Sequence, residues 1–214
     1  MIKEIDRRDV KKYMEDIIFD GTIQKQIITD RYHHNVGYDN APSVIKHGIL
    51  SVSDQHKKGI VKYTSETLKM LDDVESHVNG NNAISLAVVG LTDLYRDEIE
   101  FNPFRPHCVD FIVSDSVKAS RITTHYGNEF LSYNPIESSM LKAVDVRIIE
   151  YFDILSKMKN VDRSKIISVY ESLRKIAISL KENKVNIPLR EMSNGNNKSL
   201  DIEKISEMPK LVLK

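Results

Sequence analysis

The sequence predicts an α+β fold. Segments with helical and with strand-like patterns of apolar residues follow one another without the strand–helix–strand rhythm of a doubly wound parallel sheet. Hydrophobic residues make up 41% and charged residues 29% of the 214 residues, which is an ordinary globular composition. A chain of this size can bury a core as one large domain, or as one domain with an appended segment.

A helix and a strand are expected at the start of the chain. Residues 6–20 carry apolar side chains at the spacing of one helical face. Gly21 suits the left-handed position just past the end of such a helix. A short strand is then expected over residues 27–33.

Two further helices are predicted before the middle of the chain. Residues 39–48 contain both a helix start and a helix stop, because Pro42 fits the first turn and Gly48 closes the end. Residues 65–78 repeat apolar side chains at helical spacing and are followed by Gly80.

The middle of the chain is predicted to form strands. Pro103 and Pro106 exclude a helix just before one of them. The expected strands are short apolar runs, at residues 83–89, 109–113, 130–133 and 144–149. These strands would form the sheet of the domain.

The last third of the chain has the clearest helical pattern, over residues 162–183. Seven apolar side chains form one stripe along it: Ile166, Ile167, Tyr170, Leu173, Ile176, Ala177 and Leu180. Each contributes roughly 1.5–3 kcal/mol when fully buried, so the stripe must be covered, and we expect it to pack on the sheet. A polar, turn-rich segment at 192–199 precedes a short amphipathic tail. The predicted organisation is a core over residues 1–155 and a helical extension over residues 156–214 packed on it.

Composition and charge narrow the classes of function. Lysines plus arginines equal aspartates plus glutamates, at 31 each, and a protein that binds nucleic acid usually has a basic excess. Cys108 is the only cysteine, so no disulfide can form within the chain, which fits a reducing compartment. The charged first residues do not resemble a signal peptide, and there is no apolar run of about 18 residues. A cytoplasmic location without membrane contact is expected.

Common enzyme motifs are missing from the sequence. There is no glycine-rich phosphate loop and no paired-cysteine zinc pattern. Neither a G-x-S-x-G nucleophile elbow nor an H-E-x-x-H helix occurs.

Three polar clusters remain as candidate sites. Residues 32–35 (Tyr-His-His-Asn) end a predicted strand, where the two histidines would point to opposite faces. Residues 120–130 are dense in hydrogen-bonding side chains and lead into another strand. Residues 93–100 carry many acids. The alternative for each cluster is a solvated surface segment. This is the favoured interpretation of residues 93–100 and, taken on their own, of residues 32–35.

The first cluster and the helix after it resemble the opening of the ADP-ribosyltransferase superfamily. In its PARP-like, RNA 2′-phosphotransferase-like and DarT-like branches, a strand ending in Tyr-His-Gly-Thr or a variant is followed by a short helix and Gly-Leu. Here residues 32–35 precede Asn-Ala-Pro-Ser-Val-Ile-Lys-His-Gly-Ile-Leu at 40–50. The resemblance implies a split antiparallel sheet with flanking helices, to which a C-terminal helix is added.

The same resemblance implies roles for individual residues. His33 would bind the ribose of NAD and Asn35 its nicotinamide end, while Tyr63 falls near the position of the stacking tyrosine. Glu129 would be the catalytic glutamate at the front of a late strand, which stabilises the ribosyl cation as nicotinamide leaves. Two further residues, Arg121 and Tyr126, complete the implied site. Arg121 would position the pyrophosphate or the target, and Tyr126 would join the NAD-binding group.

The predicted function is therefore NAD-dependent ADP-ribosyl transfer to a macromolecule, such as a bacterial or phage toxin or defence effector performs. NAD is the expected substrate, no metal is required, and the acceptor is a protein or a nucleic acid. A homo-oligomer or an antitoxin-like partner is left open. One alternative is a non-catalytic binding or regulatory module with a degenerate transferase fold. Another is a metal-dependent hydrolase that uses histidines 33, 34, 47 and 125.

Overall fold

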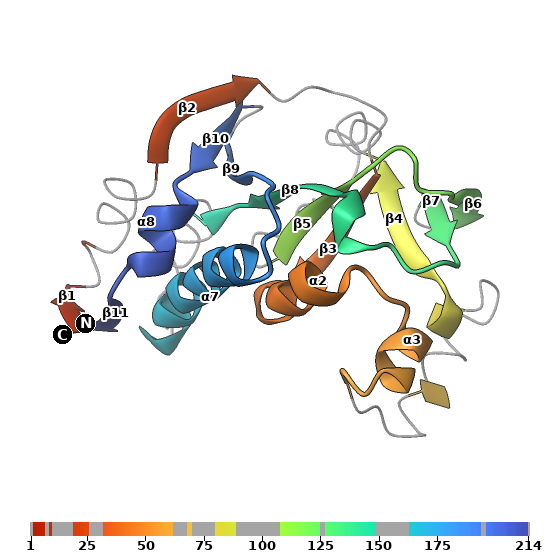
Figure 1. The fold of residues 1–214 in the computed structure, drawn as a ribbon, viewed down its shortest axis with the longest axis horizontal. Helices are drawn as coiled ribbons and strands as arrows, with labels where there is room; N and C mark the ends of the chain where they lie inside the picture. Colours follow the sequence, from red (N-terminus) through yellow and green to blue (C-terminus); the bar gives the residue numbers. More distant parts are fainter. Residues whose placement is uncertain are drawn as a thin grey trace.

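Nine strands of the described part of the chain form one sheet, and two more pair separately (Figure 1). The computed structural model describes residues 2–6, 9, 19–25, 32–61, 68–69, 80–88, 108–124, 127–148, 163–193 and 196–213. The strands of the sheet, in spatial order, are β2 (Phe19–Lys25), β10 (Asn196–Leu200), β9 (Leu189–Ser193), β8 (Leu141–Val146), β5 (Cys108–Val113), β3 (Tyr32–Gly37), β4 (Ile84–Val88), β7 (Gly127–Ser132) and β6 (Ser120–Thr124). Separately, β1 (Ile2–Ile5) pairs in parallel with β11 (Lys210–Leu213).

The sheet is antiparallel except at one place, which confirms the α+β class. Only β8 and β9 run in parallel among the described strands of the sheet. Parallel neighbours need a long crossover, and here the chain between them includes helix α7 (Arg163–Glu182). The predicted absence of strand–helix–strand rhythm therefore holds for most of the fold but not for this unit.

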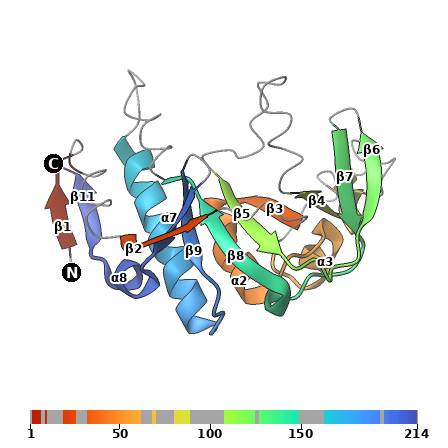
Figure 2. The ribbon, with the colours of Figure 1, turned by 90° about the horizontal axis from the view of Figure 1, so that it is seen from above.

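Helices cover one face of the sheet. Helix α2 (Ala41–His47) packs beside α7, and both lie on the same side of the central strands (Figure 2). The remaining helices of the described chain are α3 (Val52–Lys57) and α8 (Ile202–Glu207), with short 3-10 turns at Tyr38–Asn40, Gly80–Asn82 and Ser138–Met140. The covered face is apolar, since Phe111 and Val144 from the strands and Ile45 and Leu173 from the helices are fully buried in one core cluster.

The helix predicted over residues 162–183 is confirmed as α7. Tyr170, Leu173, Ile176 and Ala177 of its apolar stripe have no exposed surface. The Tyr170 hydroxyl also donates a hydrogen bond to the carbonyl oxygen of Pro209 at 2.7 Å. The stripe is thus covered within the chain, as we expected from its width.

The end of the chain contains strands as well as helices. Strands β9 and β10 form a hairpin, and β9 pairs with β8, so residues 189–200 belong to the central sheet. A C-terminal helical extension was predicted from the sequence, and in the structure this part of the chain also contributes strands, because the turn-rich segment at 192–199 includes the ends of β9 and β10. The division between residues 155 and 156 stays a prediction.

Several other sequence predictions meet the structure only in part. Strands are confirmed near residues 84–88, 108–113, 127–132 and 141–146, and α2 matches the helix predicted between Pro42 and Gly48. Residues 19–21 lie in β2, so the predicted helix does not extend to residue 20 and Gly21 does not end it. Residues 10–18, 27–31 and 93–100 lie outside the described part, as does most of 65–78. The polar segment 120–124, which was not among the predicted strands, is strand β6.

Gly48 directly follows α2, and of the three glycines described in the structure it is the one where a side chain would clash with its surroundings. Its φ of +77° favours glycine, and its amide donates to the carbonyl of Val44 at 2.8 Å. A Cβ atom built there would lie 2.1 Å from the carbonyl oxygen of Ile136. That carbonyl accepts the amide of Ile49 at 2.8 Å, so it cannot move without breaking the bridge.

We predict that Gly48→Ala lowers the free energy of unfolding by at least about 3 kcal/mol, because strain in the left-handed region adds to the clash with Ile136. Gly59→Ala is the matched control, since Gly59 also has a positive φ of +67° but its Cβ would meet nothing within 4 Å. The control should lose only about 1–2 kcal/mol. Urea denaturation measures the free energy of unfolding of both variants. Equal losses would contradict the prediction, because the clash with Ile136 would then add nothing to the strain.

Candidate functional site

A row of polar residues crosses the centre of the sheet. The strand registers set Asn35 opposite Asp110, Asp110 opposite Asp145, Asp145 opposite Arg190 and Arg190 opposite Ser199. These positions span β3, β5, β8, β9 and β10 in one line. Since side chains alternate along a strand, the row lies on the face opposite to that covered by α2 and α7.

Asp110 connects two of the predicted NAD-binding residues. Its Oδ1 atom lies 3.2 Å from Nδ1 of His33 and accepts a hydrogen bond of 2.9 Å from Nδ2 of Asn35. His33 and Asp110 are both 3% exposed, so this contact is made away from water. A carboxylate oxygen accepts a hydrogen bond, so this contact favours a proton on Nδ1 of His33.

Asp145 and Arg190 form a buried ion pair beside this group. Nε and Nη2 of Arg190 donate to the two carboxylate oxygens of Asp145, at 2.6 and 2.8 Å. Burial raises the pKa of Asp145 above its usual range, while the hydrogen bonds and charge of Arg190 oppose that shift. The nearby Asp110 carboxylate raises the pKa further, and the guanidinium of Arg190 is the main group that lowers it.

His34 lies on the other face and makes a different contact. Its Nδ1 is 2.8 Å from the carbonyl oxygen of Ser85, and burial is the largest cause that lowers the pKa of His34. In the register His34 stands opposite Phe111, a core residue, whereas His33 stands opposite Ile112. The two histidines therefore point in opposite directions, as strand geometry predicted, and His33 is the one that shares a face with Asn35.

Strand β7 brings Glu129 near the row of His33. His33 is paired with Ala87 of β4, and Leu86 is paired with Phe130 of β7. The next position in this antiparallel register sets Glu129 beside Ala87, so the backbones of His33 and Glu129 are separated by one strand, or about 10 Å. The side chain of Glu129 is outside what the structure describes.

An aromatic contact supports this register from the opposite face. The rings of Tyr32 and Phe130 lie 5.3 Å apart at an angle of 53°, and both residues pack against the helix-covered core. Tyr32 immediately precedes His33, and Phe130 immediately follows Glu129. Because neighbours alternate, this contact is consistent with His33 and Glu129 occupying positions of the other face.

The structure does not bring the remaining predicted residues to this row. Arg121 is exposed and stands opposite Phe130, which is the face away from His33. Tyr63 and Tyr126 lie outside the described residues, as does His125. His47, at the end of α2, is not on the strand that carries His33. Thus His33, Asn35 and the backbone of Glu129 are brought together, and Arg121 is not.

Asp110, Asp145 and Arg190 were missed by the sequence analysis. The two aspartates sit in Val-Asp-Phe and Val-Asp-Val runs, which were interpreted only as apolar strands. A single carboxylate inside such a run is a usable signal, since a buried charge requires a partner. Arg190 carries no such signal, because only the parallel pairing of β9 with β8 brings it to Asp145.

Two negative findings apply to the described part of the chain. In that part, no group of three or more histidine, cysteine, aspartate or glutamate residues is arranged to hold a metal ion. None of the described helices is both long enough and apolar enough to cross a bilayer.

Comparisons of the chain with protein-family models, with curated proteins and with solved structures find no match.

We predict that Arg190→Met lowers the free energy of unfolding by about 3–5 kcal/mol at pH 7, because Asp145 is left buried and charged without its partner. Adding Asp145→Asn should recover part of this loss, since the amide removes the charge. Arg121→Met is the control, and a change at this exposed position should stay within about 0.5 kcal/mol. If the double variant were as unstable as the single one, charge compensation would not be the role of Arg190.

The loss in Arg190→Met should also depend on pH. Without the guanidinium the pKa of Asp145 rises further, so the folded state binds a proton more tightly than the unfolded state, whose pKa is about 3.9. For a carboxyl group shifted upward, stability is lost as pH rises through the folded pKa. The deficit relative to the unmodified protein should therefore shrink on acidification from pH 7 towards pH 4, as chemical denaturation at each pH would measure.

Proposed function

We propose that the chain is an NAD-dependent ADP-ribosyltransferase that modifies a macromolecule. The family resemblance implies His33 for ribose binding and Glu129 for catalysis. The observation that carries the proposal is that these two residues occupy positions in one row of the sheet, with a single strand between them. They are 96 residues apart in the sequence (129 − 33). Residues this far apart in the sequence come close through the pairing of strands, not through a local sequence pattern.

The course of the chain after β3 also supports the resemblance. Strand β3 leads through the 3-10 turn Tyr38–Asn40 directly into α2, which ends at Gly48. This is the strand, short helix and Gly-Ile-Leu order on which the resemblance rests. His33 and Asn35 share a face of that strand, as a nucleotide held by both would require.

In the proposed reaction, the bond between the nicotinamide nitrogen and ribose C1′ breaks and nicotinamide leaves with the bonding electron pair. The Glu129 carboxylate stabilises the positive charge that develops on the ribose. A nucleophile of the acceptor then attacks C1′ and loses its proton. His33 would hold a ribose hydroxyl through Nε2, and Asp110 would keep the imidazole in the tautomer and orientation that this contact needs.

A second candidate is a binding module with the same fold but no turnover. The observation that favours it is the hydrogen bond from Asn35 to Asp110, which engages the amide inside the protein rather than with a ligand. In this case NAD would bind weakly or not at all, and no nicotinamide would be released. The measurements below separate the two candidates.

We predict that the purified chain releases nicotinamide from NAD and that Glu129→Gln slows this release by ~100- to 1000-fold, because the amide cannot stabilise the ribosyl cation. NAD affinity and the melting temperature should change little. Glu137→Gln is the control, since Glu137 is an exposed glutamate just before the 3-10 turn Ser138–Met140, outside the strands, and should retain turnover. Chromatographic measurement of free nicotinamide decides the result. Release by Glu129→Gln at the normal rate would remove Glu129 from the chemistry, and no release by the unmodified chain would favour the binding module.

We also predict that His33→Gln weakens NAD binding at least tenfold, whereas His34→Gln leaves it within about twofold. The reason is that the two side chains lie on opposite faces of β3, and only His33 shares its face with Asn35 and Asp110. Calorimetric titration of NAD into both variants measures this, after circular dichroism has established that each is folded. Equal weakening in both would mean that NAD does not bind on the face of the polar row.

A further inference from the structure

The buried carboxylate of Asp110 uses only one of its two oxygens within the described part of the chain. Its Oδ1 atom makes both contacts, with Nδ1 of His33 at 3.2 Å and with Nδ2 of Asn35 at 2.9 Å. Among the described residues, no donor reaches Oδ2. Asp110 is only 3% exposed, and a buried acceptor without a donor is costly. Such an atom calls for an explanation, and a bound ligand that donates a hydrogen bond is one.

The arginine of the polar row is already engaged elsewhere. Nε and Nη2 of Arg190 donate to the two oxygens of Asp145, so this guanidinium is directed at the neighbouring carboxylate. The more exposed Asp54 and Asp201 also have partners at both oxygens. Asp110 differs from these three residues, because half of its acceptor capacity is left over.

Asn35 provides a second acceptor beside Asp110. A carboxylate accepts hydrogen bonds, so the amide nitrogen of Asn35 must be the atom that faces Oδ1 of Asp110. The amide oxygen of Asn35 therefore points away from this bond, and within the described part of the chain it has no donor either. Asn35 is half-buried. Two acceptors on one face of the sheet suit a ligand that brings several donors.

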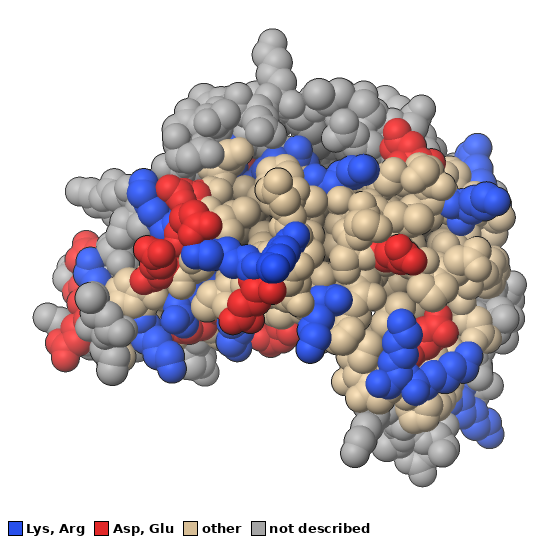
Figure 3. Space-filling view, in the orientation of Figure 1, with Lys and Arg blue, Asp and Glu red and all other residues tan. Residues whose placement is uncertain are grey.

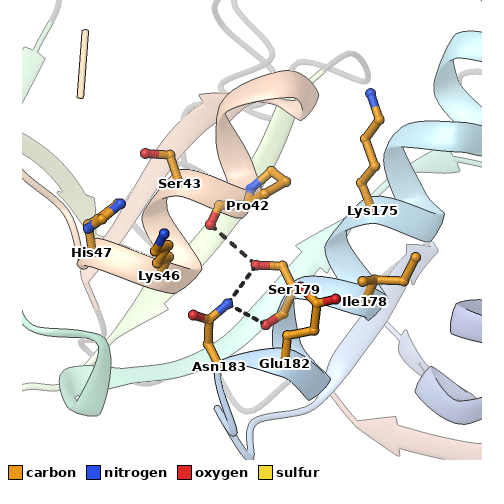
Figure 4. Close-up of a pocket in the computed structure, with 9 residues that line it drawn as sticks. All are labelled: Pro42, Ser43, Lys46, His47, Lys175, Ile178, Ser179, Glu182 and Asn183. Atoms are coloured by element: carbon orange, nitrogen blue, oxygen red, sulfur yellow. Dashed lines mark hydrogen bonds between the residues drawn. The ribbon is translucent and has the colours of Figure 1, made fainter. Parts of the chain in front are cut away.

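The hollow between α2 and α7, on the outer side of the helices, does not give the same indication. Ser179 and Asn183, which line it, already bond to Pro42 and to each other (Figure 4). The acid at this hollow, Glu182, is exposed, and Figure 3 shows acidic and basic side chains mixed over this side of the molecule. Water can solvate an exposed carboxylate, so only the buried acceptor of Asp110 points to a ligand.

We propose that Asp110 contacts the substrate directly, through a hydrogen bond from a hydroxyl of the nicotinamide-side ribose of NAD to Oδ2. A single carboxylate oxygen suits one O–H donor, whereas a metal ion requires several ligands. Because Oδ1 of the same carboxylate bonds to His33, the hydroxyl at Asp110 is the neighbour of the one that His33 holds. The inference rests on the proposed function, and it adds a residue that the family resemblance does not imply. It also makes Asp110 a specificity residue, which selects ribose over deoxyribose.

The test changes the ligand and the side chain together. The two probes are NAD and an NAD analogue whose nicotinamide-side ribose lacks both free hydroxyls. Calorimetric titration of the full chain should show NAD binding ~100-fold more tightly than the analogue, because a site built to bond a hydroxyl rejects a ligand without it. In Asp110→Asn an amide nitrogen replaces Oδ2, so the preference for NAD should fall about tenfold or more, as the loss of a hydrogen bond to a charged group produces.

Asp115→Asn is the matched control. Asp115 is exposed just after β5, the strand that carries Asp110, so this variant should keep the full preference for NAD. Asp110→Asn should remain folded, because its amide oxygen can still accept from His33 and Asn35 and a like charge opposite Asp145 is removed. A purely structural role of Asp110 would weaken the binding of both probes equally and leave the preference unchanged.

Two results would overturn the proposal. The first is an unchanged preference for NAD in Asp110→Asn. The second is equal binding of both probes by the unmodified chain, and this measurement needs no variant to fold. Either result leaves the transferase proposal standing if the unmodified chain releases nicotinamide. Failure to bind NAD at all would overturn both proposals, so the outcomes can be told apart.

Discussion

The buried carboxyl groups of Asp110 and Asp145 lie opposite each other in the middle of the sheet, and neighbouring side chains must compensate them. Asp110 and Asp145 are cross-strand neighbours on β5 and β8, and like charges in such positions destabilise a sheet. Arg190 compensates Asp145 with a two-pronged hydrogen bond, while His33 and Asn35 donate to Asp110. The need for these partners brings together four strands that are distant in the sequence.

Because Asp145 needs Arg190 as a partner, the C-terminal segment that carries Arg190 is part of the domain. Arg190 reaches Asp145 only because β9 runs parallel to β8, and the parallel arrangement depends on α7 crossing between them. The apolar stripe of α7 covers the opposite face of the same strands, and Tyr170 holds the segment near Pro209. Removing residues after β8 would therefore expose an apolar face and leave a buried carboxylate without its partner.

The two faces of the sheet differ in chemistry, and the candidate site follows from that difference. On one face, apolar residues pack against α2 and α7. On the other, the polar row holds His33 in a defined orientation next to the strand pair that carries Glu129. Side chains alternate along β3, so its two neighbouring histidines lie on different faces. One side of the strand therefore packs in the core, and the other side contributes to the candidate site.

The sequence by itself determined the elements whose signals are local. Apolar periodicity identified α7, proline and glycine positions bounded α2, and alternation separated His33 from His34, because each depends on residues within one or two turns or strands.

The partners of His33 could not be found in this way. Asp110 looked like one polar residue in an apolar strand, and Arg190 lay in a stretch with no helical or strand pattern. Strand order and register decide whether β9 joins the sheet, whether Glu129 lies in the row of His33 and whether Arg121 faces away from it. Pairing between distant strands is decided by the packing of the whole sheet, so only the tertiary structure could decide them.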